Sequence, residues 1–142
     1  MTADPTGILD TNAVILIDRL DPEDLPAEPR ITAITLAELS VGPLVATDDT
    51  ERAARQARLQ QTEAAFDPLP FDASAARAFG RVAASLRRSG RKPAARAFDA
   101  MIAAIAVAND VPVYTCNAQD FEGIDSVRVH QIAHPDGRRG RR

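Results

Sequence analysis

Short apolar runs alternate along the chain with longer segments in which apolar residues recur every three or four positions. The apolar runs predict strands over residues 7–9, 31–34, 111–115 and 127–132. The periodic segments predict helices over residues 12–20, 36–44, 48–66, 73–88 and 97–108, the last of them apolar on almost every face and therefore buried. The proline-containing stretches 21–30 and 67–72 predict a loop and a short extended piece at a sheet edge, and 91–96 predicts a turn.

Strands separated by helices predict an α/β fold with right-handed crossovers, in which a mostly parallel sheet has helices on both faces. At 142 residues the chain is long enough for one domain with a full hydrophobic core. We expect this domain to cover residues 1–135 and to be followed by a basic, disordered tail, residues 136–142, which holds four arginines. In open parallel sheets the functional crevice lies beyond the carboxyl ends of the strands.

Composition and charge narrow the class of protein. The single cysteine, Cys116, excludes a disulfide within the chain, and we interpret it as a small packing residue. No segment is apolar for long enough to span a bilayer and no signal peptide is recognisable, so we expect a cytoplasmic protein without a membrane partner. The net charge is −3, but residues 1–137 carry 13 basic against 20 acidic groups. A protein of this charge that acts on nucleic acid has to neutralise its own acids locally, and a divalent cation does so.

Acidic or amide side chains follow three of the predicted strands or begin a helix. Asp10 follows the first strand, and Glu38 lies four residues after the second. Asp99 lies in the first turns of the apolar helix, and Asn117 and Asp120 follow the third strand. Because the carboxyl ends of parallel strands meet at one edge, we expect these side chains to gather there.

Each of these side chains also has a purely structural interpretation. Asp10 fits the N-cap of the following helix, and Glu38 fits a capping box that begins at Thr35. Asn117 and Asp120 belong to residue types that are common in turns. The helix dipole would favour Asp99 near the start of its helix. Asp99 nevertheless lies on the apolar stripe of a buried helix, with no basic residue one turn later. A buried carboxylate has to be paired or bind a metal, so its partner is either a distant arginine or a cation shared with the other acids.

The types of residue at this edge favour one kind of metal. Several carboxylates in one place repel one another unless a cation lies between them. Oxygen ligands without histidine or cysteine select Mg²⁺, with Mn²⁺ as a possible substitute, over zinc. His130 and His134 are not spaced as a metal pair, and we expect them to be structural or solvent-exposed. Magnesium held by carboxylates activates water for attack on a phosphodiester and stabilises the leaving oxygen, which is the chemistry that these residues predict.

Four segments resemble, in order and spacing, the motifs of PIN-domain nucleases, and in particular VapC-type toxins of toxin–antitoxin pairs. They are GILDTNAVI from Gly7, ITLAELSVG around Glu38, FDAMIAAIA around Asp99 and TCNAQDFEGI around Asn117. The resemblance extends from Gly7 to about Ile132. It implies a three-layer α/β/α PIN-like fold and a magnesium-dependent endoribonuclease.

The resemblance also implies roles for individual residues. Asp10, Glu38 and Asp99 match the acidic triad and would act as catalytic residues and metal ligands, with Asp10 and Asp99 the first choice as direct ligands. The fourth acidic position falls where this chain has Asn117, with Asp120 three residues later. Whether Asp120 takes that position, or Asn117 only orients a water, stays open.

We expect the substrate-binding residues to lie close to these acids. Thr11 and Thr115 are suited to hydrogen-bond the acidic residues, and Thr11 and Asn117 are candidates for contact with RNA. The densest basic patch is a candidate to steer phosphates and is also consistent with a solvated loop; it comprises Arg87, Arg88, Arg91, Lys92 and Arg96, of which the last three are the favoured RNA contacts.

The resemblance implies protein partners as well, namely a homodimer and a VapB-type antitoxin whose tail lies in a groove between helices. The predicted helices 36–44 and 48–66 could supply that groove. Three other hypotheses stay in view: a DNA-directed nuclease of the same fold, a catalytically silent dimeric scaffold or co-repressor, and an aspartyl phosphatase. The last is disfavoured because such enzymes commonly have a second aspartate two residues after the first, and this chain has Asn12 there.

Overall fold

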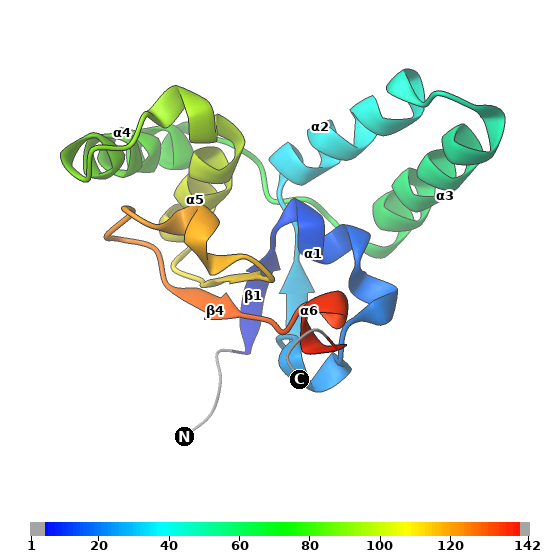
Figure 1. The fold of residues 1–142 in the computed structure, drawn as a ribbon. Helices are drawn as coiled ribbons and strands as arrows, with labels where there is room; N and C mark the ends of the chain where they lie inside the picture. The colour runs from blue at the N-terminus through cyan, green and yellow to red at the C-terminus, as the bar shows by residue number, and fades with distance from the viewer. Residues whose placement is uncertain (1–4, 140–142) are drawn as a thin grey trace.

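The computed structural model describes residues 5–139, which form a four-stranded, all-parallel sheet with helices around it (Figure 1). The strand order is β2-β1-β3-β4. The strands are β1 (Thr6–Leu9), β2 (Glu28–Arg30), β3 (Val113–Thr115) and β4 (Val129–Gln131). In register, Ile8 lies opposite Val113, and Val113 lies opposite Val129. The first strand of the chain therefore lies inside the sheet, next to a strand formed more than 100 residues later.

Five α-helices lie between these strands in the sequence, and a sixth follows the last strand. They are α1 (Thr11–Ile15), α2 (Ala33–Val41), α3 (Asp49–Ala65), α4 (Ala73–Arg88), α5 (Ala97–Asn109) and α6 (Pro135–Arg139). Several of these helices have an N-cap side chain, whose oxygen accepts a hydrogen bond from a free backbone N–H and so stabilises the start of the helix. Asp48 and Asp72 cap α3 and α4 in this way. Gly90, with φ 85°, follows the end of α4, where a left-handed conformation favours glycine.

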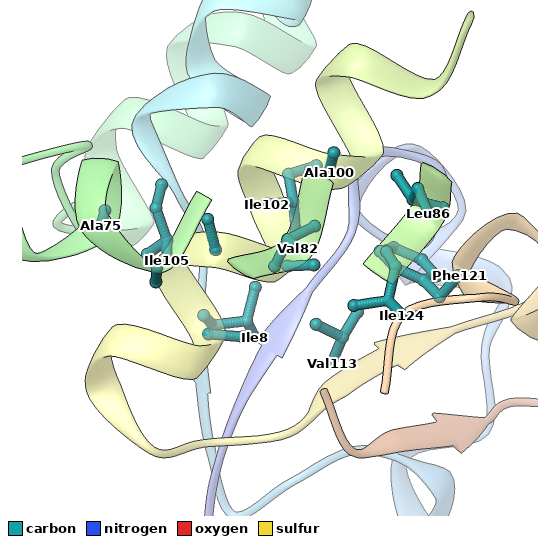
Figure 2. Close-up of a cluster of buried hydrophobic side chains, with 14 residues drawn as sticks. Ile8, Ala75, Val82, Leu86, Ala100, Ile102, Ile105, Val113, Phe121 and Ile124 are labelled. Carbon is teal, nitrogen blue, oxygen red and sulfur yellow. The ribbon is translucent and has the colours of Figure 1, made fainter. Parts of the chain in front are cut away.

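Helices cover both faces of the sheet, and neighbouring strand residues point to opposite faces. Ile8 and Val113 belong to one buried cluster, which they share with α4 and α5 (Figure 2). Leu9 and Tyr114, the next residue in each strand, belong to a second cluster on the other face, packed by α1, α2 and α3. One sheet with a layer of helices packed on each of its two faces is a three-layer α/β/α arrangement, as expected.

The second strand lies three residues earlier than the apolar pattern predicts. Residues 31–34 do not form it, since Ile31 and Thr32 lead directly into α2, which contains the rest of that run. The strand occupies Glu28–Arg30, inside the stretch predicted as a loop. Pro29 is tolerated because β2 is an edge strand with β1 as its neighbour. Residues 67–72 contribute only a single bridge, between Thr32 and Leu69, in place of an edge strand.

The start of the predicted basic tail is helical in the structure. Asp136 in α6 accepts a hydrogen bond from Arg19 at 2.6 Å, an exposed ion pair that joins α6 to the segment after α1. Residues 140–142, where the tail prediction also falls, lie outside the described residues. Within residues 5–139, no helix combines the length and the apolar character needed to cross a membrane.

Candidate active site

Asp10 is the most deeply buried of the acidic side chains predicted to form a site, with 3% of its surface exposed. Its Oδ1 accepts a hydrogen bond from the backbone N–H of Ala13 at 2.9 Å, so Asp10 caps α1. Its Oδ2 accepts from Thr115 Oγ1 at 2.6 Å, at the end of β3. A carboxylate oxygen has two lone pairs, so both oxygens can still bind another group. The capping role and a metal-binding role are therefore compatible.

Glu38 is oriented by threonines, and not by a capping box. Thr11 Oγ1 donates to Glu38 Oε1 at 2.5 Å and lies 2.9 Å from Thr35 Oγ1. The cap of α2 is Thr32, whose hydroxyl accepts from the backbone N–H of Thr35 at 3.2 Å. The capping-box interpretation of Thr35 and Glu38 is thus wrong, because α2 begins three residues earlier than that interpretation requires. The Glu38 carboxylate is left to face the end of β1.

Asp99 lies in the first turn of α5 and is partly buried. Burial is the largest cause that raises its pKa, to about 6, and the nearby charges of Asp120, Asp10 and Glu38 raise it further. Arg96 opposes this rise, as the smallest of the causes. Among residues 5–139, no group hydrogen-bonds to the Asp99 carboxylate or pairs with it within 4.0 Å. The distant-arginine explanation for Asp99 therefore finds no ion pair in the described chain.

Asp120 lies in the short 3₁₀ segment η5 (Ala118–Phe121) that follows β3, and Asn117 is the residue just before that segment. Asn117 Nδ2 donates to Asp120 Oδ1 at 3.2 Å, while the Asn117 backbone N–H donates to Thr115 Oγ1 at 3.0 Å. Arg96 donates to the Asp120 carbonyl at 2.8 Å, and its guanidinium lies 3.9 Å from Asp120 Oδ1. Asn117 thus contacts the carboxylate that follows it, and Thr115 connects this segment to Asp10.

The four carboxylates influence one another electrically. The pKa of Asp10 is raised chiefly by burial and partly by Asp120 and Glu38, against the lowering effect of its bonds to Thr115 and Ala13. As the side chains stand, no three His, Cys, Asp or Glu side chains of residues 5–139 are grouped tightly enough to hold a metal ion. The donors are nevertheless all hard oxygens and suffer the repulsion that a bound cation relieves, so they fit Mg²⁺ or Mn²⁺. The unbonded Asp99 carboxylate is the one freest to move toward an ion.

The predicted basic patch is only partly free of internal partners. Arg91 donates to Glu122 at 2.6 Å, and Arg88 donates to Asp125 at 3.3 Å. Arg96 is held by the backbone around Asp120, which places it beside the carboxylates. Lys92 is exposed on a hollow of about 380 Å³ at the turn before α5. Of this patch, Arg96 is the residue whose guanidinium lies closest to the acids in the contacts described.

Two further side chains beside the site were not predicted. Thr35 is fully buried and bonds to Thr11, and Arg58 of α3 lines a hollow together with Thr11 and Glu38. The threonine carried a signal, since it is a polar residue within an otherwise apolar run. Arg58 carried none, because it is one of several arginines on a polar helix and only the packing of α3 beside α2 brings it to the site.

The model of the PIN domain matches residues 8–126. The chain belongs to the PIN-domain family. It is 38% identical to Ribonuclease VapC5 of Mycobacterium tuberculosis over 134 residues, which cover 92% of this chain and 96% of the relative. The expected family and fold class are therefore confirmed.

Solved PIN-domain structures extend this likeness to three dimensions. VapBC-5 of Mycobacterium tuberculosis, a member of the VapBC family of toxin–antitoxin systems, superposes with a TM-score of 0.78 at 36% identity. That match covers 89% of this chain and 98% of the solved chain. DNA-bound VapBC of Salmonella typhimurium gives a TM-score of 0.72 at 27% identity, with 91% and 98% of the two chains covered.

Proposed function

We propose that this PIN-domain chain is the toxin of a VapBC-type toxin–antitoxin pair and acts as a magnesium-dependent endoribonuclease. The observation that carries the proposal is the set of mutually repelling carboxylates, Asp10, Glu38, Asp99 and Asp120, at the carboxyl end of the central strands. These carboxylates belong to a chain that is 38% identical, over most of its length, to a relative named as a ribonuclease. Carboxylates that repel one another destabilise a fold unless a cation or a substrate compensates them.

In this proposal Asp10, Asp99 and Glu38 hold the divalent ion, Mg²⁺ or in its place Mn²⁺. When bound, such an ion lowers the pKa of water and stabilises the charge on a leaving oxygen. Thr115 and the Ala13 amide hold the Asp10 carboxylate in place, and Thr11 does the same for Glu38. Such outer contacts fix the orientation of ligands.

Asp120 is assigned the fourth acidic position, with Asn117 as the residue that orients it. The 3.2 Å contact from Asn117 Nδ2 to Asp120 Oδ1 supports this assignment, as does the influence of Asp120 on the pKa values of Asp10 and Asp99. Arg96 is placed to reduce the repulsion between these acids and an incoming phosphate. Asn117, Thr11, Arg91 and Lys92 remain candidates for contact with RNA.

The partners in this proposal are RNA, a VapB-type antitoxin and a second copy of the chain. One solved relative is described as a member of the VapBC family of toxin–antitoxin systems, and the fold offers hollows on which a peptide segment could lie. One of about 340 Å³ lies between the segment after β1 and α3, where Ile15, Ile17 and Phe66 line it. A second hollow, lined by Glu38 and Leu39 of α2 and by Arg55 and Arg58 of α3, lies where the groove between residues 36–44 and 48–66 was expected, and Thr11 and Ile15 of α1 line it as well. A toxin that cuts cellular RNA would act in the cytoplasm.

The test is cleavage of total bacterial RNA by the purified chain in Mg²⁺, beside the variants Asp10→Asn and Asp99→Asn. We expect discrete fragments from the wild type, none from the variants, and none after chelation of the metal. The fragments also identify the RNA and the cleavage sequence. A folded wild type that cuts single-stranded DNA and no RNA would replace the proposal with a DNA nuclease, and no cleavage of either would favour a silent scaffold.

A further inference from the structure

A hollow of about 410 Å³ opens beside the candidate active site and is lined by three helices. One end is formed by Thr11 and Glu38, the pair joined by the 2.5 Å hydrogen bond. Side chains with different chemistry form the rest of its wall: the apolar Ile15 and Leu39 and the cationic Arg55 and Arg58. Figure 1 shows α3, which carries both arginines, running beside α2, which carries Glu38.

The two arginines differ in what already binds them. Arg55 donates to the carbonyl of Gly42 at 2.9 Å and lies 3.4 Å from the Glu51 carboxylate, so its charge is compensated within the fold. The Arg58 guanidinium has no hydrogen bond and no ion pair within residues 5–139. Arg58 is only partly exposed, and it lines both this hollow and the neighbouring one. A half-buried arginine without an anion in the fold keeps its donors available for an external one.

A nuclease with an acidic centre has to bring a polyanion up to four carboxylates. The negative charge of these carboxylates also opposes the approach of a phosphodiester. A cation near the acids offsets this repulsion, and an arginine does so with directional bonds to phosphate oxygens. An apolar wall beside it suits a ribose or an unstacked base, and Ile15 is 38% exposed there.

We propose that Arg58 binds a phosphate of single-stranded RNA next to the bond that is cut, with the adjoining nucleotide lying against Ile15. Arg55 donates to the Gly42 carbonyl just after α2 and so holds α3 beside α2, with Arg58 lining the hollow. This inference rests on the proposed ribonuclease function, and it assigns to the chain a substrate-binding residue that lies outside the four PIN motifs.

The test measures binding of a short fluorescein-labelled single-stranded RNA of mixed sequence by anisotropy, in magnesium and over a series of salt concentrations. Asp99→Asn serves as the uncut background, into which Arg58→Gln, Arg58→Lys and Arg52→Gln are introduced. Arg52→Gln is the matched control, because it removes the same charge from the same helix but lies at an exposed pair with Asp49 away from the hollow. Cleavage by the same substitutions without Asp99→Asn is measured in parallel.

We expect Arg58→Gln to weaken RNA binding about tenfold, as for the loss of one charge-assisted contact. The slope of log affinity against log salt should become shallower by about 0.7, the value for one phosphate of a single strand. Arg58→Lys should keep the slope and lose part of the affinity, since a point charge remains. Arg52→Gln should change neither.

Equal affinities and slopes for Arg58→Gln and Arg52→Gln would overturn the inference. So would loss of cleavage by Arg58→Gln without weaker RNA binding, because the residue would then act through the fold or the chemistry. If the wild type cuts no RNA while Arg58→Gln still lowers binding and slope, the proposed ribonuclease function fails and the phosphate contact stands. If Arg58→Gln does not fold, the slope of Arg58→Lys decides, since a slope shallower than wild type would contradict a charge-based contact.

Discussion

Replacing Asp99 by Asn should stabilise the protein while abolishing its activity. The carboxylate has no partner within residues 5–139, and burial together with Asp120, Asp10 and Glu38 raises its pKa to about 6 from an ordinary value of 3.8. The folded protein therefore binds this proton more tightly than the unfolded chain does. Stability falls as the pH rises from about 3.8 to about 6 and stays reduced above that window. Asparagine carries no charge that is buried or repelled, so it removes this penalty.

The size of the effect follows from the same shift. The pKa of Asp99 moves by about two units, and each unit corresponds to about 1.4 kcal/mol, which gives an upper limit near 3 kcal/mol at neutral pH. Asp99 is partly exposed, and water screens part of the repulsion, so we expect a gain of about 1 to 2 kcal/mol. For a chain of this length that gain raises the melting temperature by roughly 3 to 8 °C.

Thermal unfolding of Asp99→Asn and wild type, in chelator and over a pH series, measures this difference. The gain should be full at pH 7.5 and vanish near pH 4, where the carboxyl is protonated in both states. Asp67→Asn is the control, since Asp67 is exposed and has no ionic partner in the described chain, and it should change nothing at either pH. A variant less stable than wild type at pH 7.5, or one with the same gain at both pH values, would refute the repulsion argument.

Three further predictions concern the neighbouring groups. Thr115→Val should cost about 2 kcal/mol in urea unfolding and slow RNA cleavage, because it removes the 2.6 Å bond that lowers the pKa of Asp10; unchanged stability would contradict a formed bond. Glu38→Gln should lower RNA cleavage with little change in the free energy of unfolding. Thr32→Ala should lower that free energy by about 1 kcal/mol and leave cleavage intact, since Thr32 is the cap of α2. The reverse pattern would support the capping box of Thr35 and Glu38. Magnesium should raise the melting temperature of wild type at pH 7.5 more than at pH 5, and not that of Asp10→Asn; an equal rise in both proteins would place the ion elsewhere.

The sequence pattern predicts the helices and the position of the acids well where local signals agree. The bounds of α4, residues 73–88, follow from an aspartate cap, an apolar stripe and a terminal glycine. The predicted position of the edge strand β2 is wrong. Whether Pro29 can lie in a strand is decided by pairing with the neighbouring strand β1, and not by the composition of the segment itself. The same three-residue error makes Thr35 look like a cap, although Thr32 has that role.

The contacts that tune the site were beyond any local pattern. Thr11 with Thr35, Thr115 with Asp10, and the place of Arg58 beside Glu38 join segments that are 20 to 105 positions apart in the chain. Such pairings depend on how helices pack over the sheet, and one sequence carries no record of that packing. The gathering of these acids at one edge could be expected from the sequence, because parallel strands bring their ends to one edge whatever the loops do.

The central place of β1 also sets the order in which the protein can become active during synthesis. Asp10 leaves the ribosome early, but its strand is bonded to β3 and its carboxylate to Thr115. Asp99 and Asp120 are translated only after most of the chain has been made. A nascent chain therefore carries Asp10 without Thr115 and Asp120 until residues 113–120 have emerged and folded beside it. Under the proposed function, this order of synthesis keeps the acids of the site apart for most of the translation of the chain, and an antitoxin already in the cell has that interval in which to bind.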